Sequence, residues 1–135
     1  MILADTSVWV NHFRRASASF ALRLETGEIA IHTLVLGELA MGNLRRRRET
    51  LAALHVLPRV KEGTGSECLS YLETHQLFGR GIGWNDVQLL VAAQLNHIPL
   101  WSLDQPLARA AEKLGLLYSE GRAPASRTSR TYVNG

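Results

Sequence analysis

The chain has 135 residues, of which 46% are hydrophobic, and its formal net charge is +3. This length and composition suit a single globular domain with its own core. No stretch approaches the roughly 18 apolar residues of a membrane span, and the first residues lack the basic and apolar regions of a signal peptide. Cys68 is the only cysteine, which excludes an internal disulfide framework. We therefore expect a cytoplasmic protein that is not bound to a membrane.

Short apolar runs alternate with helical segments along the first 118 residues, which predicts an α/β domain with a parallel sheet. The segment 56–60 contains Pro58, which favours the edge of the sheet. In chain order, we predict strand 1–4, helices 8–13 and 17–26, strand 29–32, helix 34–44, a helix ending at residue 54, strand 56–60, helices 66–78 and 86–96, strand 98–103, helix 106–114 and strand 116–118.

The last segment of the chain differs in composition from the rest. Residues 119–135 are dominated by Ser, Thr, Arg, Ala and Gly and show no hydrophobic periodicity. Such a segment cannot bury enough apolar surface to fold by itself. We expect a domain over residues 1–118 and a basic, flexible tail over residues 119–135, although a partner could also order this tail.

Four carboxylates lie in unusually apolar surroundings. Asp5 and Asp104 follow apolar runs, Asp86 opens an apolar helix, and Glu38 is the only charged residue of the segment TLVLGELAMGNL. Burying a carboxylate costs free energy unless the acid is paired or bound to a cation. Oxygen ligands of this kind suit Mg²⁺ or Mn²⁺. The four acids together predict a divalent metal site.

Each acid also has a simpler explanation. The three aspartates precede or begin helices, where an acid caps the helix or meets its dipole, and Glu38 could pair with a buried arginine. However, Asp5 and Asp104 would lie side by side if their two strands are neighbours, because ligands of parallel sheets bind beyond the carboxyl ends of the strands. Ser7 and Ser102 could then orient the acids or a water molecule, or they could simply form capping hydrogen bonds.

The order of these motifs resembles PIN-domain nucleases. The motifs are Asp-Thr-Ser after the first strand, Gly-Glu-Leu in a helix, an Asp that opens an apolar helix, and Ser-Leu-Asp eighteen residues later, and the short length resembles the VapC-type branch, the toxins of bacterial toxin–antitoxin pairs. The resemblance implies a three-layer α/β/α sandwich whose short, mostly parallel sheet has four to five strands. It also implies an acidic quartet for catalysis and metal binding, with two supporting serines: Asp5, Glu38, Asp86 and Asp104, supported by Ser7 and Ser102.

The same resemblance implies an activity and partners. The protein would hydrolyse RNA phosphodiester bonds with one or two Mg²⁺ or Mn²⁺ ions, inhibit growth as a toxin, and be neutralised by a cognate antitoxin. We also expect a homodimer, within a larger toxin–antitoxin complex. Apolar residues of the first two predicted helices could contribute to a partner groove or to a homodimer, unless they pack in the core: Val8, Trp9, Phe13, Phe20 and Leu24. The pair Trp84–Asn85 has no assigned role.

The densest positive charge lies at Arg45, Arg46, Arg47 and Arg48, immediately after the predicted helix of Glu38. These side chains are candidates for RNA phosphate contacts, although a solvated start of the next helix explains them equally well. Two other classes remain open. One is a Mg²⁺-binding regulatory domain similar to response-regulator receivers, for which Asp5 lacks an acidic neighbour. The other is a non-catalytic module that binds RNA or protein.

Overall fold

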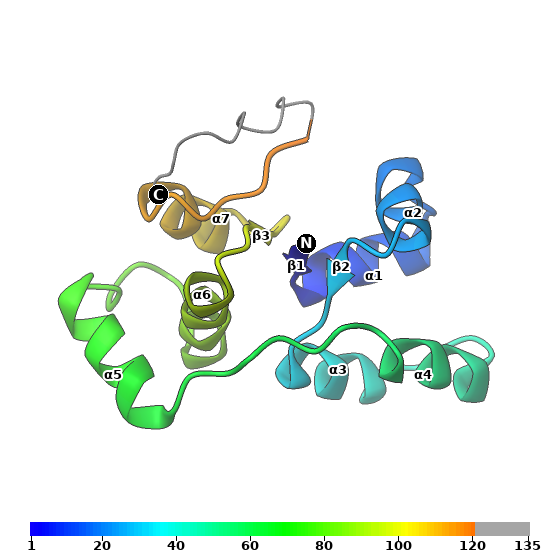
Figure 1. The fold of residues 1–135 in the computed structure, drawn as a ribbon, viewed down its shortest axis with the longest axis horizontal. Helices are drawn as coiled ribbons and strands as arrows, with labels where there is room; N and C mark the ends of the chain where they lie inside the picture. The colour runs from blue at the N-terminus through cyan, green and yellow to red at the C-terminus, as the bar shows by residue number, and fades with distance from the viewer. Residues whose placement is uncertain (121–135) are drawn as a thin grey trace.

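A computed structural model describes residues 1–120 of the chain (Figure 1). Most of the predicted tail therefore lies outside the described residues, and its flexibility stays a prediction. The described helices and strands are β1 (Ile2–Ala4), α1 (Thr6–Arg14), α2 (Ala18–Glu25), β2 (Ile29–Ala30), α3 (Thr33–Ala40), α4 (Arg47–His55), α5 (Gly65–Thr74), α6 (Trp84–Asn96), β3 (Leu100–Trp101) and α7 (Gln105–Lys113).

The sheet of the described region is parallel, with the strand order β2-β1-β3. Leu3 of β1 is the centre of the register, since it pairs with Ala30 on one side and with Leu100 on the other. The prediction of four to five strands was wrong: the described sheet has three strands. The two outer segments that we expected to be strands form only single parallel bridges, Ile31 with Arg59 and Leu100 with Leu117.

Pro58 and the shortness of these outer segments explain the narrow sheet. Pro58 has no N–H group, so it can only accept a bond from Ile31 N, while Val60 N donates back to Ile31 O. On the other edge, Leu100 N donates to Leu116 O and Tyr118 N donates to Leu100 O. Each outer segment thus completes one bridge and then leaves the sheet.

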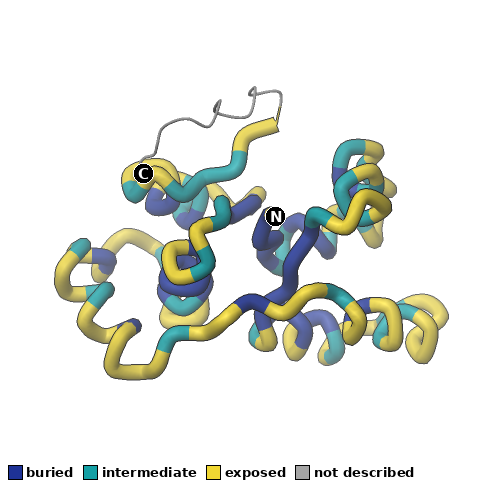
Figure 2. Tube along the Cα trace, viewed as in Figure 1, coloured by how far each residue is buried: buried dark blue, intermediate teal, exposed yellow. Residues whose placement is uncertain are grey.

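Helices surround the sheet, as the α/β prediction required. In Figure 1, α1 and α2 lie to one side of the strands, α3 and α4 lie below them, and α5, α6 and α7 lie on the opposite side. Figure 2 shows buried chain concentrated at β1, the start of α3 and the inner face of α6. The aromatic part of this core is formed by Trp9, Phe20 and Trp101, with ring centroids 4.8 Å apart for Trp9–Phe20 and 5.5 Å for Phe20–Trp101. The α/β sandwich is confirmed.

Local chemistry sets most helix boundaries. Thr64 and Glu67 form a reciprocal capping box at the start of α5, and α6 ends at His97 in the left-handed conformation, with φ 55°. The helix of Glu38 is shorter than predicted, because α3 stops at Ala40 and the Arg47 side chain bonds the free carbonyl of that residue. No helix within residues 1–120 is long and apolar enough to cross a membrane.

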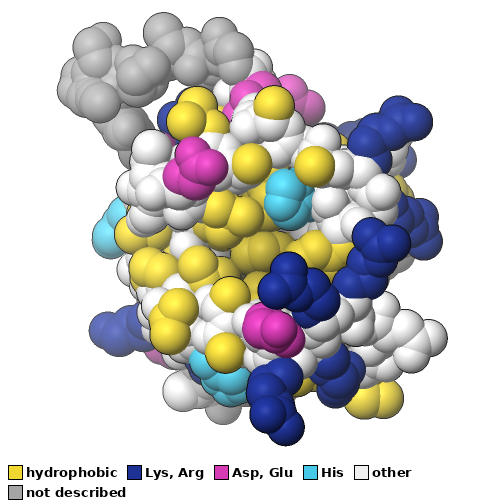
Figure 3. Space-filling model, turned by 90° about the vertical axis from the view of Figure 1, so that its right-hand side faces the viewer, with side chains coloured by type: hydrophobic (Ala, Val, Ile, Leu, Met, Phe, Trp, Pro, Cys, Tyr) yellow, Lys and Arg dark blue, Asp and Glu magenta, His cyan; other side chains and the backbone are white. Residues whose placement is uncertain are grey.

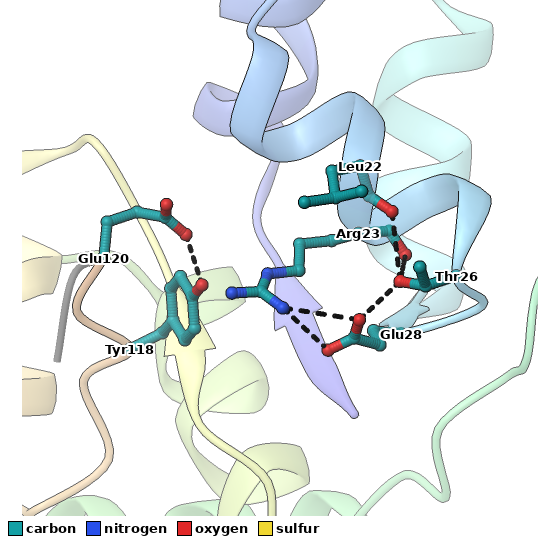
Figure 4. Close-up of polar contacts among 6 residues, drawn as sticks. All are labelled: Leu22, Arg23, Thr26, Glu28, Tyr118 and Glu120. Carbon is teal, nitrogen blue, oxygen red and sulfur yellow. Dashed lines mark hydrogen bonds and ion pairs between the residues drawn. The ribbon is translucent and has the colours of Figure 1, made fainter. Parts of the chain in front are cut away.

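Near the end of the described chain, Tyr118 contacts residues of β3 and α2. The ring of Tyr118 lies 4.6 Å from that of Trp101, centroid to centroid. Figure 4 shows the guanidinium of Arg23 between Glu28, with which it forms an ion pair at 3.2 Å, and the ring of Tyr118. The hydroxyl of Tyr118 in turn donates to Glu120. This cluster fastens the C-terminal end of the domain to α2.

Candidate active site

Two acids that are far apart in the sequence meet at the carboxyl edge of the sheet. Asp5 directly follows β1, and Asp104 follows β3 by three residues. The two strands are neighbours, and Asp5 N donates to Trp101 O at 3.0 Å. The sequence-based condition for bringing Asp5 and Asp104 together is therefore met.

Two serine hydroxyls hold the Asp5 carboxylate. Ser7 Oγ donates to Asp5 Oδ1 and Ser102 Oγ donates to Asp5 Oδ2, each at 2.5 Å. Ser7 Oγ also accepts from Leu103 N at 2.8 Å, and Ser102 Oγ accepts from Asp104 N at 3.0 Å. Both serines thus tie Asp5 to the loop that carries Asp104.

The aspartates do form helix-capping hydrogen bonds, as the simpler explanation predicted. Two of them still keep one carboxylate oxygen without a hydrogen-bond donor among residues 1–120. Asp5 caps α1 through Val8 N, Asp104 caps α7 through Leu107 N, and Asp86 accepts from Gly83 N. In Asp86 and Asp104 only Oδ2 is engaged, and Oδ1 has no hydrogen-bond donor among residues 1–120. In Asp86 and Asp104, a capping bond therefore orients the carboxylate while one oxygen remains available.

Glu38 reaches the site from α3. Its carboxylate accepts a hydrogen bond from the hydroxyl of Thr6, the residue next to Asp5. Glu38 is exposed, so the apolar surroundings that its segment suggested for this acid were wrong. The helix buries Val35, Leu36 and Leu39 and leaves the opposite face open. We did not predict a role for Thr6, although its place within Asp-Thr-Ser was a signal.

The four acids share one electrostatic environment. Burial raises the pKa of Asp5, which is only 4% exposed, and the hydrogen bonds from Ser102 and Ser7 oppose this effect. Burial also raises the pKa of Asp86, and the negative charges of Asp104, Asp5 and Glu38 raise it further. Mutual repulsion of this kind is relieved by a cation.

The donor set fits a hard divalent cation. Within the described chain, no three His, Cys, Asp or Glu side chains lie close enough together to enclose a metal ion as they stand. The four acids nevertheless provide only oxygen donors, which Mg²⁺ and Mn²⁺ prefer. Mg²⁺ usually keeps several water ligands and needs only one or two protein carboxylates, so a closed cage is not required.

A hollow with a basic rim begins beside Glu38. Its volume is about 610 Å³, and Arg14, Arg45 and Arg46 are among its lining residues. A second hollow of about 480 Å³ continues from it and shares Phe13 and Arg46. Figure 3 shows this face of the molecule, where hydrophobic side chains form the floor and Lys and Arg side chains stand on its right-hand and lower sides.

The four consecutive arginines have different environments. Arg45 and Arg46 line the hollow, and Arg46 also lies 3.7 Å from Glu49. Arg48 is exposed. Arg47 instead donates to Ala40 O at 2.7 Å and to Gly42 O at 3.1 Å, so its side chain caps the end of α3.

Comparisons with known proteins agree with this architecture. Residues 2–113 match the family model of the PIN domain. Ribonuclease VapC32 from two strains of Mycobacterium tuberculosis, CDC 1551 / Oshkosh and ATCC 25618 / H37Rv, is in each case 36% identical over 121 residues, which is 89% of this chain and 98% of the relative. The crystal structure of PAE2754 from Pyrobaculum aerophilum has the same fold, with a TM-score of 0.57 at 18% identity, covering 84% of this chain and 85% of that chain. The chain therefore belongs to the PIN domain family, and within it to the VapC-type ribonucleases.

Proposed function

We propose that this protein is a metal-dependent endoribonuclease that acts as the toxin of a toxin–antitoxin pair in the cytoplasm. The observation that carries the proposal is the environment of Asp5. This buried carboxylate is held by hydroxyls from two distant segments, and its charge acts on Asp86 together with the charges of Asp104 and Glu38. The relatives named Ribonuclease VapC32 support RNA as the substrate.

The four acids have distinct parts in this proposal. Asp5, Asp86 and Asp104 would hold one or two Mg²⁺ or Mn²⁺ ions, and Glu38 would bind the metal or position the attacking water. When bound, the metal would supply a nucleophile at neutral pH and would neutralise charge on the phosphate. In-line attack would then leave a 5′-phosphate and a 3′-hydroxyl.

The surrounding residues fix the geometry of these acids. Ser7 and Ser102 hold both oxygens of Asp5, and through Leu103 N and Asp104 N they also hold the loop that follows β3. Thr6 holds Glu38. Such positioning lowers the entropic cost of reaching the transition state, so these hydroxyl groups act through the acids that they orient.

The hollow beside Glu38 offers a path for the RNA backbone. Arg14, Arg45 and Arg46 lie around it, and guanidinium groups bind phosphates in bidentate fashion. Because the hollow also contains Glu38, a phosphate bound at its basic rim would lie near the acids. We therefore assign Arg45 and Arg46 to substrate binding, together with the exposed Arg48, but not Arg47.

The same face suits an antitoxin segment with apolar side chains and a cationic side chain. Of the apolar residues considered from the sequence, Val8, Trp9 and Phe20 are buried and belong to the core. Phe13, which is 39% exposed, and the partly buried Leu24 line the second hollow, and Trp9 also borders it from the core. A cationic antitoxin side chain would neutralise the acids in place of a metal. The homodimer stays a prediction.

Substitution of single acids tests the nuclease proposal. Asp5→Asn and Asp104→Asn should lose most metal-stimulated cleavage of single-stranded RNA, while the amide oxygen of the second variant can still accept the capping bond from Leu107 N. Glu112→Gln, an exposed acid of α7, is the matched control and should cleave normally. The assay would titrate Mg²⁺ or Mn²⁺ and map the ends of the products. Unchanged cleavage by both amide variants would refute the proposal, and no product at any metal concentration would favour a non-catalytic binding module.

A further inference from the structure

The segment before Asp86 exposes two aromatic side chains and an arginine. Phe78 is 60% exposed and Trp84 is 43% exposed, whereas Trp9 and Trp101 are only 3% and 8% exposed. Arg80 lies between the two exposed rings in the sequence and is itself exposed. Phe78 and Trp84 are only six positions apart in the sequence, and two exposed rings this close together, with an arginine between them in the chain, suggest a binding surface.

This segment lies between two helix ends that carry acids. Gly83, the residue before Trp84, donates its N–H to Asp86 Oδ2 at 3.0 Å. Gly81 lies against the start of α7, since a Cβ atom at Gly81 would be 3.7 Å from Pro106 Cβ. Pro106 follows Asp104, the cap of α7, by two residues. Gly83 therefore lies beside Asp86, and Gly81 lies against the start of the helix that Asp104 caps.

The segment is anchored and not a loose loop. Leu77 is buried at 2% exposure, and Ile82 packs against the core. Gly79 and Gly81 have φ values of 70° and 77°, a conformation that glycine adopts without strain. Arg80 Nε donates to Gln76 O at 2.9 Å, so the backbone itself orients the guanidinium. The three exposed side chains are thus presented in a defined arrangement.

We propose that Phe78, Arg80 and Trp84 form an aromatic platform that binds unpaired nucleotides of the RNA next to the cleavage site. The proposal rests on the nuclease function proposed above. Bases stack on aromatic rings whatever their sequence, and an exposed arginine near such rings in the chain can pair with a phosphate of the same strand. Residues 76–84 carry Arg80 and no acid, so their charge favours a polyanion.

The helix geometry indicates which nucleotides the platform takes. Trp84 and Asp86 are two positions apart on α6, so their side chains point about 200° apart around the helix axis. Trp84 therefore points away from the side of α6 that carries Asp86, and in this proposal it does not stack on the base at the scissile phosphate. It is placed to bind a base at least one nucleotide away. The platform would select RNA that is unpaired beside the cleaved bond.

Binding of RNA without cleavage tests the platform directly. A short labelled single-stranded RNA and a hairpin-stem duplex would be titrated with the full chain in excess chelator, and a gel would verify that the RNA stays intact. We expect Trp84→Ala to bind the single strand roughly ten-fold more weakly. Trp84→Phe should stay within about three-fold because it keeps a ring, and duplex binding should not change. Phe78→Ala is a second, independent variant with the same expected direction.

Fluorescence gives a second readout, because Trp84 is the exposed tryptophan of the chain. Single-stranded RNA should quench the tryptophan emission of the wild type but not that of Trp84→Phe. Leu22→Ala, which alters a 52% exposed side chain on α2, is the control and should bind normally. Equal RNA affinity of Trp84→Ala and the wild type would overturn the proposal. If the variant instead changed the molar mass of the protein or its affinity for the antitoxin, with no change in RNA affinity, the surface would bind a protein and not RNA, which would also overturn the proposal. Failure of the nuclease proposal alone would give a different result. Trp84→Ala would still bind the single strand more weakly and Trp84→Phe would still bind it normally, but no metal-stimulated cleavage would be seen.

Discussion

Ser102 Oγ donates a hydrogen bond to Asp5 Oδ2 at 2.5 Å and so joins two residues that are 97 positions apart in the sequence. The same hydroxyl accepts from Asp104 N. One small side chain therefore fixes a buried acid relative to an exposed one. The position of Asp104 at the site depends on this link as well as on the neighbouring strands.

Removal of the Ser102 hydroxyl should affect both stability and cleavage. In Ser102→Ala, the buried Asp5 carboxylate loses a donor and Asp104 N loses an acceptor, so we expect the free energy of unfolding to fall by about 1–3 kcal/mol. The cleavage rate at saturating RNA should fall at least roughly ten-fold, since the two acids are no longer held in place. Urea denaturation and single-turnover cleavage would measure these effects. Ser66→Ala, at an exposed position of α5, should change neither.

Asp86 should make the stability of the fold depend on pH. Burial, and then the charges of Asp104, Asp5 and Glu38, raise its pKa above the ordinary value of 3.8. An acid whose pKa is higher in the folded chain destabilises that state when it is ionised. This destabilisation is absent below pH 3.8, grows as the pH rises, and is complete above the raised pKa.

We therefore expect Asp86→Asn, whose side-chain oxygen can still accept from Gly83 N, to be more stable than the wild type at neutral pH. The gain should shrink as the pH falls toward 3.8. Added Mg²⁺ should stabilise the wild type more than the variant, since it binds the folded acids. Thermal unfolding between about pH 4 and 8, with and without Mg²⁺, would check both expectations, with Glu73→Gln on α5 as the control. A variant that loses stability at neutral pH would contradict them.

The arginine cluster should separate into structural and RNA-binding members. Arg47→Ala removes the hydrogen bonds to Ala40 O and Gly42 O, so it should lower the free energy of unfolding by about 1 kcal/mol. Arg45→Ala and Arg48→Ala should leave stability unchanged and reduce the salt dependence of RNA affinity, by about one unit in the log–log slope for each lost phosphate contact. Affinity measured over a range of salt concentrations would test this. If the salt slope of RNA affinity changed only in Arg47→Ala, Arg47 and not its neighbours would contact RNA phosphates, which would contradict our assignment.

The contact at the C-terminal end of the domain should stabilise the fold without serving the site. Tyr118→Ala removes the ring that packs on Trp101, and we expect a loss of about 1–2 kcal/mol of unfolding free energy. Tyr118→Phe keeps the ring and should retain most of that stability. Chemical denaturation would compare the two variants. Similar losses in both would mean that the hydroxyl, which donates to Glu120, contributes more than the stacked ring.

The alternation of apolar runs and helical segments was sufficient to predict the parallel α/β fold, because hydrophobic periodicity is a local property of the chain. The width of the sheet was not predictable in this way. Residues around Arg59 and Leu117 have strand-like composition, yet each contributes one bridge. Whether such a segment extends a sheet depends on the neighbouring strand and on how soon the chain must turn away.

The sequence by itself identified four acids in apolar contexts and placed Asp5 and Asp104 at strand ends. Only the tertiary structure decided that β1 and β3 are neighbours, that Thr6 holds an exposed Glu38, and that Arg47 bonds to α3. It also left Trp84, to which no motif assigned a role, exposed at the start of α6. The reason is physical: periodicity and capping act over a few residues, whereas these contacts join segments that only the packing of the core brings together.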